Sequence, residues 1–143
     1  MSKTLIAYFS ASDLFEIKPQ TNYTAADLNW NDSSSRSTLE MKDDKSRPAM
    51  AGPADVAQYD VVFVGFPIWW YQAPRIIETF LESCDFSGKT IVPFATSGGS
   101  GMGKTESILK ACCAQTAKWL PGKRLSSWES AASVRKWVDS LGL

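Results

Sequence analysis

Two short segments of this chain carry residue types that could bind a ligand. The first runs Gly65-Phe-Pro-Ile-Trp-Trp-Tyr-Gln-Ala-Pro-Arg75 and places three consecutive aromatic residues between two prolines. Three adjacent aromatic side chains on a stiff turn cannot all point into one core, so a flat conjugated ring would cover them well. The alternative is that Trp69 and Trp70 only pack at the start of the following helix.

The second segment is the glycine-rich loop Ala95-Thr-Ser-Gly-Gly-Ser-Gly-Met-Gly103. It offers backbone N–H groups and small hydroxyls just before a predicted helix, and its glycines let the main chain approach a ligand edge closely. The alternative is a flexible connection without a ligand. We expect a binding edge, because the loop follows an apolar run typical of a buried strand.

The same loop also matches a different pattern. Residues 98–105 read Gly, four residues, then Gly-Lys-Thr, which fits the phosphate-binding pattern G-x-x-x-x-G-K-[ST]. A nucleotide hydrolase also needs an acidic residue at the end of another apolar strand to hold magnesium. Asp60 precedes its strand, and no apolar strand predicted here ends in Asp or Glu. A P-loop nucleotide hydrolase is therefore the minor alternative.

Composition narrows the chemistry further. The chain has 143 residues, with 15 basic and 15 acidic side chains, which argues against a nucleic-acid or membrane-surface partner. It has no histidine, which removes Ser-His-Asp and Cys-His nucleophiles and most catalytic zinc sites. Cys84, Cys112 and Cys113 do not form a disulfide framework or a metal site, and we expect them to be packing residues. No segment resembles a membrane helix or a signal peptide, so we expect a single cytoplasmic domain over residues 1–143.

The elements that must position the two loops follow from hydrophobic patterning. Apolar runs predict strands, and apolar residues on one side predict helices. Strands are expected at 4–9, 61–66, 90–95 and in two pieces around 119–125, with an edge strand at 13–18 that stops at Pro19. Helices are expected at 24–28, 34–42 (N-capped by Asp32 or Ser33), 74–81, 104–113 and 129–141. Alternation of strands and helices indicates a parallel sheet covered on both faces, which binds ligands beyond its carboxyl strand ends.

Several other side chains carry a structural or a functional interpretation. Arg75 could meet a phosphate, but we expect a solvated helix residue. Arg36 and Glu40 are spaced i,i+4 and are expected to form a surface pair. Two further groups are interpreted structurally, the basic cluster as a solvated face and the tryptophans as core or rim: Lys118, Lys123 and Arg124; Trp119, Trp128 and Trp137.

Three longer segments together resemble the flavodoxin family. They are Thr4-Leu-Ile-Ala-Tyr-Phe-Ser10, Asp60-Val-Val-Phe-Val-Gly-Phe-Pro-Ile-Trp-Trp-Tyr71 and Phe94-Ala-Thr-Ser-Gly-Gly-Ser-Gly101. Residues 23–32 and 35–41 are also similar to a bacterial subgroup that has a Trp-Trp pair after the third strand. The resemblance implies a flavodoxin-like three-layer α/β sandwich, a mostly parallel five-stranded sheet in the order 2-1-3-4-5, and an FMN cofactor used for electron transfer or by a small flavin oxidoreductase.

The resemblance also implies which residues contact FMN. No catalytic residue and no metal is required, because the flavin carries the redox chemistry. The residues implied to border the flavin ring are Pro67, Ile68, Trp69, Trp70 and Tyr71. The residues implied to line its other side are Thr96, Ser97, Gly98, Gly99, Ser100 and Gly101, with Ser10 near the phosphate position.

The chain departs from the family after its first strand. Flavodoxins have a phosphate-binding loop and a helix there, whereas Ser10–Ser12 leads directly into segment 13–18. At about 3.5 Å per residue, three residues cannot return the chain to a parallel strand. Segment 13–18 could form a hairpin, extend the first strand, or pair with a second copy, and we favour the exchanged homodimer or the extension.

The missing loop leaves two functions open. Losing two or three phosphate contacts would weaken FMN binding by about 10³-fold. The first function is an FMN-binding electron-transfer protein or oxidoreductase whose redox partner the sequence does not name. The alternative is a shortened relative that binds FMN weakly or not at all and acts as a binding or assembly module.

Overall fold

The computed structural model of this chain describes residues 14–143. The predicted first strand at 4–9, the connection Ser10–Ser12 and the candidate residue Ser10 lie outside the described residues. Over the described part, no helix is long and apolar enough to cross a membrane.

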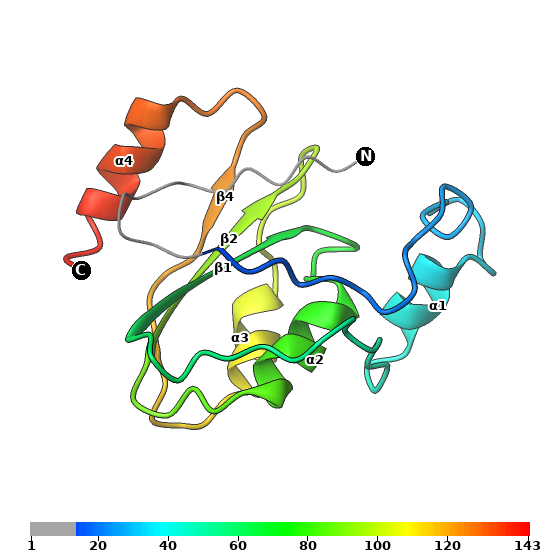
Figure 1. Ribbon diagram of the computed structural model, residues 1–143. Coiled ribbons are helices and arrows are strands. Elements are labelled where there is room, and N and C mark those ends of the chain that lie inside the picture. The colour runs from blue at the N-terminus through cyan, green and yellow to red at the C-terminus, as the bar shows by residue number, and fades with distance from the viewer. Residues whose placement is uncertain (1–13) are drawn as a thin grey trace.

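A parallel sheet forms the centre of the fold (Figure 1). β1 (Val61–Pro67) pairs with β2 (Thr90–Thr96) along their whole lengths. On its other edge β2 pairs with β3 (Lys118–Trp119) and then with β4 (Lys123–Leu125). Every pairing between these strands is parallel, which confirms the predicted mostly parallel sheet. The described residues give the order β1-β2-β3, with β4 also beside β2.

Proline chemistry explains why the last strand is in two pieces. β3 pairs with Thr90 and Ile91, β4 pairs with Phe94 to Thr96, and Pro93 lies in the gap. Pro93 has no N–H to donate to a neighbouring strand, as expected from the sequence. Opposite it, the Gly122 N–H donates to Glu106 Oε1 at 2.7 Å instead of to the sheet. The strand therefore breaks where neither chain can continue the ladder.

Helices cover both faces of the sheet, which confirms the α/β sandwich (Figure 1). α2 (Arg75–Ser83) and α3 (Thr105–Lys110) lie on one face, and α4 (Ala131–Asp139) lies on the other. The two cores use alternate residues of the strands, as the strand period of two requires. The larger core includes Val64, Phe66, Ile77, Leu81 and Leu109. The smaller core consists of Phe94, Leu125, Val134 and Val138, with Phe63 and Trp137 packed against it.

The helices of the sandwich begin and end close to their predicted limits. α4 is capped by Ser130, whose side chain accepts from the Ser133 N–H, and it starts two residues later than expected. α3 ends at Lys110 rather than at Cys113, because the chain turns at Ala111–Cys113. The shift at the start of α4 is within ordinary fraying at helix ends, whereas the end of α3 is three residues earlier than predicted.

The segment before β1 forms an arm that carries one helix. α1 (Arg36–Lys42) stands apart from the sheet in Figure 1. Its N-cap is Ser35, which accepts from the Thr38 N–H, so the predicted caps Asp32 and Ser33 are wrong. The predicted helix at 24–28 is a single turn, because Thr24 and Asp27 bond to each other's backbone N–H groups and close it.

The predicted edge strand at 13–18 is wrong over its described part. Residues 14–18 form no strand, and the only pairing nearby is an isolated antiparallel bridge between Pro19 and Met50. Phe15 stacks on Phe80 with ring centroids 6.1 Å apart, and Ile17 packs against the larger core. Side-chain packing and one backbone hydrogen bond, from the Ala51 N–H to the Lys18 carbonyl at 2.8 Å, therefore hold this segment in place of a ladder.

Candidate functional site

The two candidate loops start side by side at the carboxyl edge of the sheet. Pro67, the last residue of β1, pairs with Thr96, the last residue of β2. The next residue, Ile68, donates its N–H to the Thr96 carbonyl at 3.0 Å. The register of two parallel strands thus brings both loops to one place, as the sequence predicted.

The aromatic loop is a tight hairpin turn with its aromatic residues at the tip. Trp69 and Gln72 exchange both backbone hydrogen bonds, at 2.8 and 3.0 Å. Between them, Trp70 (φ 46°) and Tyr71 (φ 63°) both have left-handed backbones, as a type I′ turn requires. This conformation costs a non-glycine residue about 1–2 kcal/mol. The turn directs Trp70 and Tyr71 outward, with 42% and 64% of their surface exposed, so the helix-packing alternative does not hold for Trp70.

The glycine-rich loop is held by its own hydrogen bonds and by the aromatic loop. The Ser97 hydroxyl donates to the Ser100 carbonyl and accepts from the Gly99 N–H. Further along, the Thr105 hydroxyl donates to the Tyr71 carbonyl at 3.3 Å. The two loops therefore form one unit, in contrast to the alternative of an unattached connection.

A cavity of about 690 Å³ lies between these loops. Its lining combines aromatic and aliphatic side chains with hydroxyls and glycine backbone, and no charged residue is among the lining residues that the structure describes. This volume is in the range of sites for small organic ligands. The lining residues are Trp30, Ile68, Tyr71, Ser97, Gly98, Gly99, Ser100 and Gly101.

Most of the predicted site residues are found at this cavity. Ile68, Tyr71 and the whole stretch Ser97–Gly101 line it. The other predicted residues that the structure describes adjoin the cavity without lining it: Pro67, Trp69, Trp70 and Thr96. Trp30 was missed, and its only sequence signal is a large aromatic residue in a polar segment without apolar periodicity.

The nucleotide-hydrolase alternative does not fit the glycine-rich loop. In that pattern the hydroxyl of the last residue holds magnesium. Here Thr105 is fully buried, and its hydroxyl is bonded to the Tyr71 carbonyl. The residue that would face a metal ion thus serves to join the two loops.

Arg75, just after the aromatic loop, does not face solvent, so its predicted role as a solvated residue is wrong. Only 3% of it is exposed, and its guanidinium donates to the Met41 carbonyl at 3.0 Å and to the Glu40 carbonyl at 3.3 Å. The carbonyls at the end of a helix lack intrahelical partners, and a cation is stabilised there. Arg75 therefore fastens the end of α1 to the start of α2.

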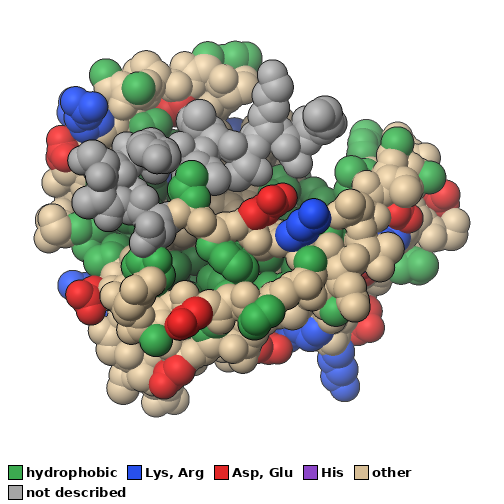
Figure 2. Space-filling model, viewed as in Figure 1, with side chains coloured by type: hydrophobic (Ala, Val, Ile, Leu, Met, Phe, Trp, Pro, Cys, Tyr) green, Lys and Arg blue, Asp and Glu red, His purple; other side chains and the backbone are tan. Residues whose placement is uncertain are grey.

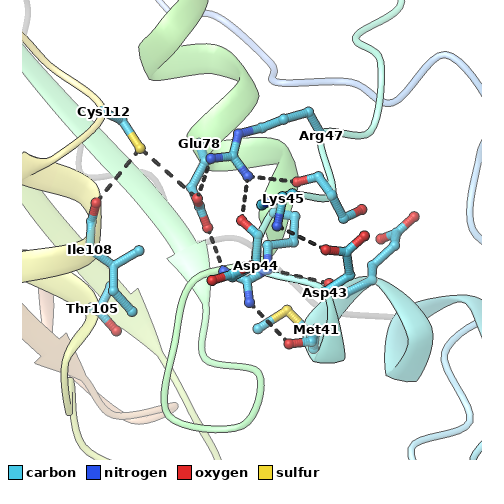
Figure 3. A network of polar contacts seen from close by, with 12 residues as sticks. Met41, Asp43, Asp44, Lys45, Arg47, Glu78, Thr105, Ile108 and Cys112 are labelled. Carbon is cyan, nitrogen blue, oxygen red and sulfur yellow. Dashed lines mark hydrogen bonds and ion pairs between the residues drawn. The ribbon is translucent and has the colours of Figure 1, made fainter.

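A buried carboxylate neutralises this arginine. Glu78, 3% exposed, accepts from Arg75 at 2.8 Å and pairs with Arg47 at 3.0 Å. Figure 3 shows Arg47 and Cys112 on either side of Glu78. The group joins α2, α3 and the segment after α1, so it supports the arm rather than the cavity.

The predicted surface pair of Arg36 and Glu40 is also part of a larger contact. Arg36 Nε lies 2.8 Å from Glu40 Oε1, and its guanidinium lies 3.8 Å above the ring of Tyr23. The Tyr23 hydroxyl donates to Glu40 Oε2 at 2.5 Å. Burial, followed by this hydrogen bond, raises the pKa of Tyr23 well above its usual value, so the phenol stays protonated. Tyr23 in turn meets Trp69 edge-on, with centroids 5.6 Å apart.

The three tryptophans predicted to be core or rim residues differ in their burial. Trp119 and Trp137 are half-buried against the two cores, as expected, whereas Trp128 is 87% exposed. The three cysteines are free and half-buried. Lys123 lies 3.9 Å from Glu129. On the face in Figure 2, positive and negative side chains are interspersed, which provides no strong field of one sign.

The fold and the cavity define a class of protein: an open parallel α/β sheet with a cavity at its carboxyl edge, the place where such sheets bind ligands. Comparison with known proteins makes this specific. The chain belongs to the flavodoxin family, whose profile, described as "Flavodoxin", matches residues 2–141.

Solved structures of similar proteins agree with this assignment. A candidate flavoprotein from Bacteroides uniformis is 48% identical, with a TM-score of 0.82 over 87% of this chain and 80% of that one. A candidate flavoprotein from Bacteroides eggerthii is 45% identical, with a TM-score of 0.84 over 92% and 82% of the two chains. A flavoprotein from Lactobacillus acidophilus in complex with FMN shares the fold at 20% identity, with a TM-score of 0.51 over 71% and 65%. No functionally curated protein matches this chain.

Proposed function

We propose that this chain binds FMN in the cavity between its two loops and acts in electron transfer, as a carrier or a small flavin oxidoreductase. The observation that carries the proposal is the open cavity of ligand size between the aromatic and glycine-rich loops, which has no charged side chain among its lining residues within 14–143. Membership of the flavodoxin family supports it.

The cavity lining has the chemistry that a flavin ring requires. Ile68 and Tyr71 offer apolar and aromatic surface to the ring faces, where stacking adds to area burial. Gly98, Gly99 and Gly101 have no atom within 4 Å of an added Cβ, so their backbones border open space. Their N–H groups and the Ser100 hydroxyl can then meet the polar edge of the ring. FMN, when bound, supplies the redox chemistry, and these residues bind and orient it.

The phosphate is expected to contribute little. The lining that the described part of the chain provides has no charged side chain, and the usual phosphate-binding loop is missing from the sequence. Charge-assisted hydrogen bonds are the strong contacts that such a loop provides. We therefore expect FMN and riboflavin, which lacks the phosphate, to bind with dissociation constants within about tenfold of each other.

Titration with FMN tests the proposal, with flavin fluorescence and visible absorption as readouts. We expect quenching that saturates, and electron transfer from the chemically reduced complex to cytochrome c. Gly99→Val fills the cavity and should weaken FMN binding about tenfold or more. Gly52→Val is the matched control, because an added Cβ there also meets no atom within 4 Å but lies away from the cavity.

The opposite outcome supports the second candidate function. In that outcome the purified protein is colourless, and the wild type, Gly99→Val and Gly52→Val all fail to bind added FMN. The chain would then be a shortened relative with a binding or assembly role.

A further inference from the structure

One wall of the cavity comes from outside the two loops. Trp30, on the arm before α1, lines the cavity together with Tyr71 and the Ser97–Gly101 loop. It keeps 70% of its surface exposed, so burial of the indole contributes little to the stability of the fold. Core packing therefore does not explain why Trp30 lies at the cavity.

The backbone that carries Trp30 is held by its own hydrogen bonds. Trp30 is the second residue of a turn in which the Asp32 N–H donates to the Asn29 carbonyl at 3.0 Å. The Asn29 side chain accepts from the Asn31 N–H at 3.2 Å, and the Asp32 side chain accepts from the Ser34 N–H at 2.8 Å. Such Asx bonds fix the turn before any ligand arrives.

The turn is also tied to the helix that follows it. The Ser37 N–H, in the first turn of α1, donates to the Asp27 carbonyl at 2.9 Å. Arg36 reaches back to the Thr21 carbonyl at 2.7 Å. The chain on both sides of Trp30 is thus hydrogen-bonded to α1. The turn that carries Trp30 therefore has a fixed position relative to this helix.

Two contacts between residues far apart in sequence fix the arm relative to the cavity. Arg75 at the start of α2 binds the last carbonyls of α1, including that of Met41 at 3.0 Å. Tyr23 meets Trp69 of the aromatic loop edge-on. A backbone held in advance loses less entropy when its side chain binds a ligand, so the turn that carries Trp30 is preorganised to present the indole to one.

The lining chemistry indicates what the indole would contact. Aromatic surface from Trp30 and Tyr71 favours a flat conjugated molecule, and the hydroxyls and glycine backbone favour hydrogen-bonding groups at its edge. None of the lining residues found in 14–143 is charged, which favours a neutral ring. A flavin ring without its phosphate has these properties.

We propose that Trp30 is a ligand-contacting residue of the flavin cavity, and that its indole stacks on the planar, uncharged ring. This inference rests on the proposed flavin site and adds to it a wall that the arm supplies. Trp30 would then strengthen ring binding where the phosphate contributes little.

Titration with lumiflavin, the flavin ring without the ribityl phosphate, tests the inference by fluorescence quenching and by the shift of the visible absorption band. We expect Trp30→Ala to weaken lumiflavin binding about tenfold and to reduce the band shift, as loss of one stacking partner does. Trp30→Phe keeps a smaller ring and should lose less. Trp128→Ala is the matched control, because Trp128 is exposed but does not line the cavity. Thermal unfolding of all variants should match the wild type, because neither indole is buried.

The outcomes separate this inference from the proposed function. If Trp30→Ala and Trp128→Ala both bind lumiflavin as the wild type does, the contact is overturned while the flavin site stands. If the wild type binds lumiflavin in a Trp30-dependent way but does not bind FMN, the inference holds and the proposed function fails. If the wild type binds neither molecule, both are overturned.

Discussion

The carbonyl oxygen of Tyr71 lies 2.7 Å from the position that a Cβ on Gly103 would occupy. Gly103 also has a left-handed backbone, with φ of 54°. Both facts require glycine, because a side chain there would be strained and would collide with main chain. This contact, together with the Thr105 hydroxyl, is what holds the aromatic loop against the glycine-rich loop.

Gly103→Ala should therefore destabilise the protein and disturb the cavity. We expect a loss of about 2 kcal/mol in the free energy of unfolding, from backbone strain and displacement of Tyr71. Urea denaturation measures the loss, and FMN titration should show weaker binding. Gly52→Ala is the control, because its added Cβ meets no atom within 4 Å and Gly52 does not line the cavity. Equal stability of the two variants would contradict the proposed contact.

Glu78→Gln should be more damaging than the chemically similar change at Glu82. Glu78 is buried and pairs with Arg75 and with Arg47, so its neutralisation leaves the buried Arg75 guanidinium without a counter-charge. Figure 3 shows the contact between Glu78 and Arg47. Breaking a buried pair in this way costs about 3–5 kcal/mol. Glu82 is 43% exposed at its side chain, so its pair with Arg47 should contribute less than about 1 kcal/mol. Chemical denaturation of both variants gives the comparison, and equal losses would refute it.

Acid should destabilise the fold through carboxylates with lowered pKa values. A hydrogen bond from Arg47 holds the pKa of Glu82 below its ordinary value of 4.5. A carboxylate of this kind binds fewer protons folded than unfolded, so its contribution is complete above about pH 4.5 and is lost as pH falls through the lower, folded pKa. Hydrogen bonds from neighbouring residues lower the pKa of further carboxyls in the same direction: Asp27, Asp32, Asp85 and Glu129.

The contribution of Glu82 can be isolated from the others. Thermal midpoints measured from neutral pH down to about pH 3 should fall for the wild type and fall less steeply for Glu82→Gln. Because Glu82 is partly exposed, the difference between the two profiles, converted to free energy of unfolding, should stay below about 1 kcal/mol. Parallel profiles would show that the pair with Arg47 is not formed in solution.

The thiols of Cys112 and Cys113 should be unreactive in the folded protein. Burial, followed by the charges of Glu78 and Glu82, raises the pKa of Cys112 to about 12, and burial raises the pKa of Cys113 to about 11. Because the thiolate is the reactive form, at about pH 8 both should react with a thiol reagent about 100-fold more slowly than in unfolded protein. Denatured protein, in which every cysteine is accessible, is the control. Rapid labelling of Cys112 in the native state would show that the thiol is not buried beside Glu78 and Glu82 in solution.

The short connection near the N-terminus favours an exchanged homodimer or an extension of the first strand, and the mass in solution tests the homodimer. Ser10–Ser12 is too short for a parallel return, and residues 14–18 form no strand. Leu14 and Phe15 remain about half exposed, at 55% and 51%, and a second copy could cover them. Light scattering should give about twice the chain mass of 15.7 kDa. A mass near 16 kDa would rule the dimer out.

The sequence by itself determined the elements of the sandwich and the edge at which its ligand cavity forms. β1, β2 and α2 follow from apolar runs and one-sided apolar spacing, which are local properties of the chain. The meeting of the two loops follows equally, because parallel strands end at the same edge of a sheet. For this reason Ile68, Tyr71 and Ser97–Gly101 line one cavity, and their contact with FMN stays a prediction.

Only the tertiary structure decided how the arm before β1 completes the site. Arg75 carries a charge that alone predicts solvent exposure, yet it is buried because the carbonyls at the end of α1, 34 and 35 residues earlier, need a donor. Trp30 likewise lines the cavity because distant contacts place its turn there, not because of its neighbours in sequence. Local patterns report which face of an element is apolar, whereas partners of polar groups and exposed aromatic residues are set by packing between segments far apart in the chain.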